Sequence, residues 1–356
     1  MTTIRIGIIG AGAASHAIHI PGFRRCEGVE LAAVCDPDPA ASAATGITPA
    51  YTGYRELLEG AVDAVVIAAP NHLHHEIALA AVERGRHVLC EKPLALNLAQ
   101  AREMLDAADR AGVVHMTAFT YHYTPAFRWL HHLAGTDALG KLRTVRAAYL
   151  MALSGHLLGW RSRREYAGSG VLADIGSHLI HLVQLAAGPV ESLAAMKRRF
   201  REDPSSDVED WIAFLAKFEN GACGTFEISR VCPGRGAAIT EEMFIELYGD
   251  AGSAVMSMQD PWALYLAIGE AGRDPSRALE RVTVPAELLK IDGSPRDVHD
   301  GDPRWSYRFD QAFQFAGSIR LGRSRVPSFA EGVRCQAVLD AALAASDSGG
   351  WTAVAR

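Results

Sequence analysis

The amino-terminal segment constrains the fold of this chain more than any other feature. A β-branched run at 4–9 leads into a turn with Gly10 and Gly12, and helical sequence follows to about residue 25. A glycine turn between a buried strand and a helix is typical of a nucleotide-binding βαβ unit. Continuous apolar strands separated by helices predict a doubly wound parallel sheet covered on both faces. We expect its other strands at 29–35, 64–68, 87–90 and 113–119, and helices at 74–84 and 98–111.

The pattern changes after about residue 123. Later strands are longer and alternate between apolar and polar residues, and Asn220-Gly221 is a hairpin-type turn between two of them. A length of 356 residues also favours two domains. The sequence predicts an α/β domain at 1–122 and an α+β domain at 123–356 with a large open, mainly antiparallel sheet. In the second domain we expect strands at 143–149, 211–218, 223–229 and 244–248. We expect helices at 172–187, 307–321 and 330–345, and an irregular loop at 269–304. The last helix is a candidate to pack back on the first domain.

Charge and cysteine usage exclude several classes of partner. The formal net charge is −6 without a long run of like charge, which argues against nucleic acid and anionic membranes as partners. The six cysteines form no CxxC pair, and the histidines at 72, 74 and 75 lack the convergent spacing of ligands, so we expect no metal site. No basic leader precedes the first strand, and no apolar run reaches about 20 residues. A cytoplasmic location follows as an expectation.

The glycine turn predicts a dinucleotide site. Gly10 permits the tight turn, and Gly12 lets the backbone approach a pyrophosphate at the helix start, where Ala13 and Ala14 follow. Asp36 ends the second strand, where a carboxylate accepts hydrogen bonds from ribose hydroxyls and repels a 2′-phosphate. The sequence therefore favours NAD over NADP. The alternative is that Asp36, or equally Asp38, caps the next helix.

Two further strand ends carry polar residues. Ala69, Pro70 and Asn71 follow the third strand and would line the nicotinamide side of the same site. Lys92 follows the fourth strand and precedes Pro93, which blocks helical continuation. Because ligands bind at strand ends of α/β sheets, Lys92 is a candidate to hold a substrate hydroxyl. The alternative is an ordinary surface lysine.

A second set of candidate residues lies near the middle of the chain. Asp174 and His178 are four residues apart on an expected helix and would share one face. A carboxylate beside an imidazole fixes its tautomer, which suits a general base that takes a proton from an alcohol. The alternative is a helix-terminal aspartate with a packed histidine.

These motifs resemble the glucose-fructose oxidoreductase / inositol dehydrogenase / rhizopine-catabolism (Gfo/Idh/MocA) family. The resemblance rests on the glycine turn, the Glu91-Lys92-Pro93 run, the Asp-Ile-Gly-Ser-His run at 174–178, Pro70-Asn71 with His74, and the segment 327–332. It implies a Rossmann domain and a second domain whose open sheet forms a homodimer or homotetramer. It also implies that Lys92 is catalytic, Asp174 binds substrate, His178 transfers the proton, and His74 and Glu91 belong to the cofactor site.

The resemblance implies hydride transfer between NAD(P) and one hydroxyl or carbonyl group of a sugar or cyclitol. Two positions depart from the family pattern: His181 stands where an acidic residue is frequent, and His122 where arginine is frequent. Further candidates for substrate contact are His19, Tyr121 and Arg161, although a packed histidine and an arginine that covers an aromatic ring are equal alternatives.

Three functions are compatible with these residues. The first is an NAD-dependent dehydrogenase or reductase acting on a sugar, amino sugar or cyclitol. The second is a redox-neutral glycosidase that holds NAD permanently, with Tyr121, His122 or His181 as its second acid/base. The third is a non-catalytic sensor of NAD or sugar, in which Lys92 or His178 should have been lost first.

Overall fold

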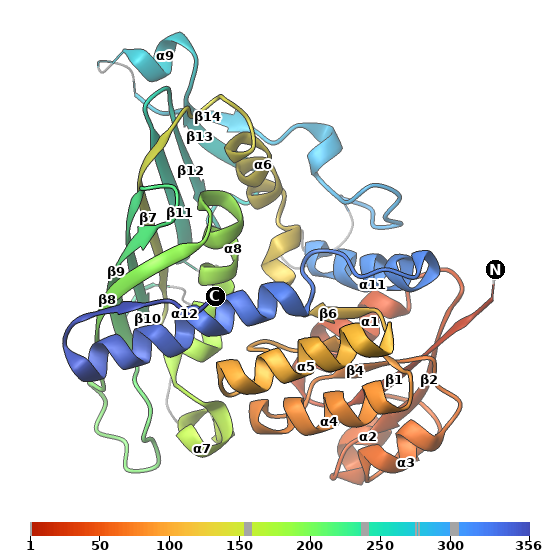
Figure 1. The fold of residues 1–356 in the computed structure, drawn as a ribbon. Coiled ribbons are helices and arrows are strands. Elements are labelled where there is room, and N and C mark those ends of the chain that lie inside the picture. Colours follow the sequence, from red (N-terminus) through yellow and green to blue (C-terminus); the bar gives the residue numbers. More distant parts are fainter. Residues whose placement is uncertain (1, 153–158, 236–241, 275, 277, 300–305) are drawn as a thin grey trace. The chain divides into compact units, whose positions relative to one another are not determined.

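The computed structural model describes residues 2–152, 159–235, 242–274, 276, 278–299 and 306–356. The chain divides into two compact units (Figure 1): Met1–Tyr123 with Lys290–Val333, and Thr124–Leu289 with Arg334–Arg356. The sequence boundary at 122 placed all of 123–356 in the second domain. The segment Lys290–Val333 joins the first unit because helix α11 (Asp310–Leu321) packs on helix α1 (Ile20–Phe23). Phe23 and Phe315 meet edge to face there, with ring centroids 6.3 Å apart.

The first unit contains a six-stranded sheet in the order β3-β2-β1-β4-β5-β6. Every pair of neighbouring strands is parallel, which confirms the predicted sheet type. The strands are β1 (Ile4–Ile9), β2 (Val29–Cys35), β3 (Ala50–Tyr51), β4 (Ala64–Ile67), β5 (His87–Cys90) and β6 (His115–Thr117). The sixth is shorter than the expected 113–119, and a 3₁₀ turn, η2 (Thr120–Tyr123), follows two residues after its end.

Side chains that alternate along these strands enter two separate cores. Ile6 and Ile8 pack with α1 and α11, whereas Ile9 and Ile67 pack with helices on the opposite face. That opposite face is covered by α3 (Tyr54–Glu59), α4 (Asn71–Glu83) and α5 (Leu98–Ala111). The sheet is therefore buried on both sides, and only the ends of its strands can receive a ligand. Helix α2 (Pro39–Ala44) follows β2.

The second unit contains a nine-stranded sheet in the order β14-β13-β12-β11-β7-β10-β9-β8-β15. All pairs are antiparallel except β7 with β10, so the prediction of a mainly antiparallel sheet is confirmed. Its strands are β7 (Leu142–Leu150), β8 (Val190–Arg198), β9 (Trp211–Phe218), β10 (Cys223–Ser229), β11 (Glu242–Gly249), β12 (Ser253–Ser257), β13 (Ala263–Ala267), β14 (Glu280–Thr283) and β15 (Trp351–Ala353).

One face of this sheet is covered and the other is exposed. Along β9, Ile212, Phe214, Ala216 and Phe218 are buried, whereas Leu215 and Lys217 between them are exposed. Helices α6 (Pro125–Ala134) and α8 (Ser177–Ala187) pack on the covered face. The stretch Arg164–Ala187 is long and apolar enough to cross a membrane by length and composition, but 78% of its most apolar window is buried, as in a core helix.

Several elements of the second unit differ from the expectations. Helix α6 and the strands β8, β12, β13 and β15 were not predicted. The expected loop 269–304 contains the short helix α9 (Glu270–Arg273) and strand β14, whose residues are all exposed and so lack an apolar pattern. Helix α12 (Phe329–Ser348), expected at 330–345, begins in the first unit and ends in the second.

Candidate functional site

The glycine turn after β1 has the geometry that a dinucleotide needs. Gly10 has φ +97°, and a Cβ on it would lie 2.5 Å from the carbonyl oxygen of Ala68, so only glycine fits. Gly12 is exposed, and a Cβ on it would meet nothing within 4 Å. The fold therefore requires Gly10, whereas the open space at Gly12 is available to a ligand. The next residues form a π-helix, η1 (Ser15–His19), whose Ser15 hydroxyl donates to the Gly10 carbonyl at 2.5 Å.

Asp36 lies beside this turn, at the carboxyl end of β2. Its Oδ2 accepts a hydrogen bond from the Ala11 amide at 2.8 Å, and its Oδ1 accepts one from the Asp38 amide at 2.9 Å. Asp38 is the residue that caps α2, because its own Oδ1 accepts from the Ala40 amide. Of the two roles considered for these aspartates, the helix cap thus belongs to Asp38. The residues of the turn and Asp36 fit an NAD molecule, with pyrophosphate at Gly12 and ribose at Asp36.

Asn71 begins α4, directly after Ala69 and Pro70 at the end of β4. His74, one turn further on, is fully buried and lies between two backbone carbonyls. Its Nδ1 is 2.9 Å from the Pro93 oxygen and its Nε2 is 3.0 Å from the Ala69 oxygen. Burial lowers the pKa of His74, and the two carbonyls oppose this shift only in part. His74 thus joins the loop after β4 to the turn that follows Lys92.

Lys92 is half-buried and directly follows Glu91 at the end of β5. Glu91 Oε1 is 2.8 Å from Nε2 of the buried His19, and its Oε2 accepts from the Lys92 amide at 3.2 Å. Burial alone would raise the pKa of Glu91, but the hydrogen bond and charge of His19, together with the nearby Lys92, lower it overall. The side chain of Glu91 is therefore an anion that fixes the backbone of Lys92. The Lys92-Pro93 peptide bond is cis.

Tyr121 and His122 lie on η2, which follows β6. Arg308, on the 3₁₀ turn η7 (Tyr307–Phe309), donates from Nη2 to the Tyr121 hydroxyl at 2.8 Å and stacks 4.8 Å above its ring. Tyr121 is buried, whereas His122 is half-buried and packs against Tyr123. Sequence reasoning missed Arg308, because no motif marks this buried arginine.

In the second unit, Asp174 lies on a π-helix, η5 (Leu172–Gly176), that continues directly as α8. The expectation of an α-helical i, i+4 face therefore does not describe this segment, since a π-helix bonds i to i+5. Arg161 Nε lies 3.5 Å from Asp174 Oδ1, and its guanidinium also covers the Trp160 ring at 4.2 Å. His178 and His181 on α8 are 7% and 2% exposed.

Two buried charged residues near Asp174 were also missed by sequence reasoning. Glu209 precedes β9 and accepts hydrogen bonds from the amides of Gly170 and Leu172 at 2.7 and 3.1 Å. Arg230 follows β10 and is 2% exposed. A charged residue next to a strand is expected on the surface, so the burial of Glu209 and Arg230 becomes visible only in the fold.

The predicted site residues fall into two groups. The first unit brings the glycine turn, Asp36, Asn71, Glu91 and Lys92 to the carboxyl ends of its strands. The second unit brings Asp174 to Arg161 and carries His178 and His181 on one helix. That Lys92 meets Asp174 and His178 stays a prediction. Among the described residues, no group of three or more His, Cys, Asp or Glu side chains is placed to hold a metal ion.

Two family models match the chain. The model of the oxidoreductase family with an NAD-binding Rossmann fold matches residues 4–119, and the GFO/IDH/MocA C-terminal domain matches residues 127–255. The chain belongs to the Gfo/Idh/MocA oxidoreductase family. This confirms the family, the fold class and NAD as the cofactor, and it makes the protein an oxidoreductase of the type that acts on CH–OH groups.

Named relatives agree with this family. Levoglucosan dehydrogenase of Pseudarthrobacter phenanthrenivorans is 30% identical over 352 residues, covering 91% of this chain and 89% of the relative. D-glucoside 3-dehydrogenase of Escherichia coli is 30% identical over 247 residues, covering 64% and 70% of the two chains. A solved structure of levoglucosan dehydrogenase in complex with NADH and levoglucosan superimposes with a TM-score of 0.90 at 27% identity, and covers all of both chains.

Proposed function

We propose that this family member is an NAD-dependent dehydrogenase that transfers hydride between the nicotinamide and a secondary hydroxyl or keto group of a pyranose sugar or its glycoside. The observation that carries the proposal is the placement of Lys92. It follows a strand whose carboxyl end lies at the same sheet edge as the NAD turn, and its backbone is fixed by Glu91, which is ionised and has a side chain only 13% exposed. A lysine held there can reach a substrate bound beside the nicotinamide.

The side chains have separate roles in this proposal. His178 takes the proton of the reacting hydroxyl, and Asp174 orients the imidazole and the substrate. Lys92 donates a hydrogen bond that stabilises negative charge on the reacting oxygen. NAD⁺, held by the glycine turn and Asp36, would supply the acceptor for the hydride of the same carbon. Tyr121, His122, Arg161, His181 and His19 are proposed to border the remaining sugar hydroxyls.

The substrate class rests on the names of the relatives. Levoglucosan dehydrogenase and D-glucoside 3-dehydrogenase both act, by name, on derivatives of glucose. A neutral glucoside is therefore the substrate to test first, with amino sugars and cyclitols next. The same names favour a dehydrogenase over a redox-neutral glycosidase.

NADH formation measures the proposed activity directly. The purified protein is mixed with NAD⁺ and a panel of free pyranoses, glucosides, amino sugars and inositols. Stoichiometric NADH with at least one sugar supports the proposal. Release of the aglycone without net NADH would instead identify the glycosidase, and tight NAD binding without any turnover would identify the sensor.

Lys92→Ala tests the role of the lysine. Removal of one preorganised donor to an oxyanion lowers kcat by about 100- to 1,000-fold. The Kd for NAD⁺ should change little, since the proposed bond is to the sugar. Lys141→Ala, at an exposed lysine of the second unit, is the matched control and should keep full activity. Equal loss of NAD⁺ affinity and kcat in Lys92→Ala would count against the assignment.

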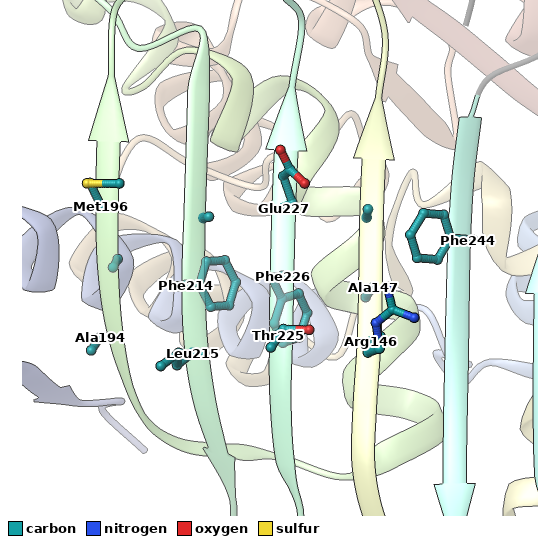
Figure 2. A pocket seen from close by; sticks show the side chains of 13 residues that line it. Arg146, Ala147, Ala194, Met196, Phe214, Leu215, Thr225, Phe226, Glu227 and Phe244 are labelled. Atoms are coloured by element: carbon teal, nitrogen blue, oxygen red, sulfur yellow. The ribbon is translucent and has the colours of Figure 1, made fainter. Parts of the chain in front are cut away.

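We further propose that the protein is a homodimer through the exposed face of the second sheet. Leu215 and Met196 on this face are 54% and 50% exposed, and a hollow of about 490 Å³ crosses the neighbouring strands. Figure 2 shows Met196, Leu215, Glu227 and Arg146 on four adjacent strands of this sheet. Single exposed apolar residues are normal, but a contiguous apolar surface is typical of an interface.

Two charged residues of this face already have partners within one subunit. Arg146 bonds Glu246 at 2.8 Å, and Glu227 accepts from the Trp211 indole at 3.0 Å. Such pairs lower the penalty of burying the face against a second copy, and a two-fold interface uses the same surface on both subunits. The mass of the protein in solution by light scattering tests this proposal; a monomer at micromolar concentration would refute it.

A cytoplasmic location is also proposed. All six cysteines are free, and four of them are buried. Reduced cysteines fit a reducing compartment. Fractionation of cells that express the tagged protein checks this, and recovery in the periplasm would contradict it.

A further inference from the structure

Glu209 and Arg230 are buried residues of opposite charge that line the same small cavity. Glu209 is 4% exposed and Arg230 is 2% exposed, and they flank the antiparallel strands β9 and β10. Neither residue belongs to the proposed reaction steps. Burial of two full charges is expensive unless each has a structural or chemical task.

Glu209 holds the entry of the π-helix through three consecutive amides. Its Oε1 accepts from Gly170 and Leu172 at 2.7 and 3.1 Å, and its backbone carbonyl accepts from Val171 at 3.0 Å. The contact is so close that a Cβ on Gly170 would lie 2.0 Å from the Glu209 carbonyl oxygen. Asp174 lies two residues after Leu172, the last of these amides. Glu209 therefore fixes the backbone that leads into Asp174.

Arg230 supplies the positive charge of this buried region. Burial lowers the pKa of Arg230, while the negative charges of Asp174, then Glu209 and Asp210, raise it against the opposing charge of Arg201. An arginine stays charged in proteins even when buried. Strand β10, which ends one residue before Arg230, packs against the π-helix that carries Asp174. Asp174 also has the half-exposed Arg161, whose Nε lies 3.5 Å from its Oδ1. Arg230 is thus a buried positive charge near the segment of Asp174.

The cavity beside this pair is too small for a substrate. Arg230 Nη2 and Glu209 Oε2 have no hydrogen-bond partner among the described residues, and both residues line a cavity of about 10 Å³. Its other charged residues are Arg199, Arg201, Asp203 and Asp210. About one water molecule fits such a volume, whereas a sugar does not. This cavity therefore gives Arg230 no contact with a sugar.

We propose that Glu209 and Arg230 are positioning residues of the active site: Glu209 fixes the π-helix of Asp174, and Arg230 keeps Asp174 ionised. The proposal rests on the proposed dehydrogenase function. Two carboxylates close together in a buried site favour protonation of one of them unless a cation is present. A protonated Asp174 would lack the negative charge that stabilises a protonated His178, and the base would lose its support.

The pH profile of kcat/KM tests the charge of the pair with variants of opposite sign. Arg230→Met should move the acid limb to higher pH by about one to three units, because a nearby cation lowers a carboxylate pKa by that amount. Glu209→Gln, which retains an oxygen for the amides of Gly170 and Leu172, should move the limb to lower pH. Arg230→Lys should restore much of the wild-type profile, and Arg143→Met, at an exposed arginine, should change nothing.

A lower plateau with an unmoved acid limb in both charge variants would overturn the proposal and leave a purely structural role. If wild type forms no NADH with any sugar, the proposed function fails and this role fails with it. Turnover with an unmoved limb overturns only the role of the pair.

A double-mutant cycle on thermal unfolding gives a readout that needs no activity. Removal of Arg230 takes away the buried positive charge near Asp174 and Glu209 and leaves Asp174 with the half-exposed Arg161, so Asp174→Asn should raise the Tm of Arg230→Met by several degrees. The same Asp174→Asn change in wild type should not raise the Tm. Additive effects of the two substitutions would overturn the electrostatic coupling. If Arg230→Met alone does not fold, we expect the double variant Arg230→Met with Asp174→Asn to fold. The proposal is contradicted if the double variant also does not fold and the acid limb of Glu209→Gln does not move.

Discussion

Two buried histidines fix the backbone on either side of the Lys92 side chain. His19 holds Glu91, which accepts the Lys92 amide, and His74 contacts the carbonyl of Pro93. Hydrogen bonds to buried charged groups are the stronger ones, because an unpaired partner would be left without solvent. The position of the lysine is thus set before any ligand binds.

Ionisation of Glu91 should make the first unit sensitive to acid. Burial opposes and His19 favours the charged form, with a net pKa below the ordinary 4.5. A lowered carboxylate pKa adds stability above the unfolded-state pKa, and this stability is lost as pH falls from about 4.5 through the folded-state pKa. Urea unfolding of Glu91→Gln should therefore show a flatter loss of stability below pH 4.5 than wild type.

The exposed pair of His75 and Glu103 provides the control for that experiment. Its two side chains are also 2.8 Å apart, but Glu103 is 58% exposed. Surface ion pairs contribute about 0–1 kcal/mol. Glu103→Gln should leave the pH dependence as in wild type. If both variants follow the wild-type curve, Glu91 is not the acid-sensitive group.

Asp36 should determine affinity for NAD. Asp36→Ala removes the carboxylate that faces the turn, and a hydrogen bond to a charged group contributes about 1.5–3 kcal/mol. Calorimetry should show NAD⁺ binding weakened about 10- to 100-fold, with relatively more NADP⁺ binding because the repulsion of a 2′-phosphate is removed. Asp38→Ala loses only the cap of α2, about 1 kcal/mol of stability, and should bind NAD⁺ normally. Equal effects of both variants would remove the distinction between them.

Residue roles could be predicted from the sequence only where position in the chain indicates position in the sheet. Lys92 and Asp36 each follow an apolar strand, so their place at a strand end was visible in the sequence. Glu209, Arg230 and Arg308 are charged residues without such a pattern, and their burial depends on strands and helices distant in sequence. Sequence reasoning assigns such residues to the surface by default.

At the scale of elements, each of the two groups of predicted site residues has a π-helix next to it or within it. η1 follows the glycine turn, and η5 carries Asp174. Single π-helical turns inside helices are frequent at functional sites because they re-aim side chains. Neither turn could be predicted, since π- and α-helices share the same residue preferences and differ in which backbone groups bond.

The two glycines of the first turn should respond differently to alanine. Gly12→Ala places its Cβ in open space, so the Tm should stay within about 1 °C of wild type while NAD⁺ binding weakens by an order of magnitude or more. Gly10→Ala forces a Cβ against the Ala68 carbonyl at positive φ and should lower the Tm by several degrees. Thermal melts and calorimetry on both variants check this. A normal NAD⁺ affinity for Gly12→Ala would contradict the assigned pyrophosphate position.

Strands were predictable where apolar residues are continuous or alternate regularly. β1, β2 and β5 have the expected bounds because their residues face two cores, and β9 and β10 because buried and exposed residues alternate along them. Strand β14 was missed because all four of its residues are exposed and it pairs at the edge of the sheet. The parallel pairing of β7 with β10 could not be predicted from the sequence either, because strand order depends on contacts between segments about 80 residues apart.

At the scale of the whole molecule, the exposed sheet face should control association. Leu215→Glu puts a charge in the proposed two-fold interface and should convert the dimer to a monomer in analytical ultracentrifugation. Leu321→Glu is the matched control, because Leu321 is 53% exposed but lies on α11 of the first unit. That variant should remain dimeric. Loss of the dimer in both variants, or in neither, would place the interface elsewhere.

The proposal that three side chains of two units act on one carbon is tested most directly by a crystal structure with NADH and a glucoside. The Lys92 ammonium and the His178 imidazole should each lie about 2.6–3.2 Å from the same sugar hydroxyl, with Asp174 in contact with the imidazole or the sugar. The carbon that bears this hydroxyl should face nicotinamide C4. A sugar bound with residue 92 and residue 178 in separate solvent regions would contradict the proposed mechanism.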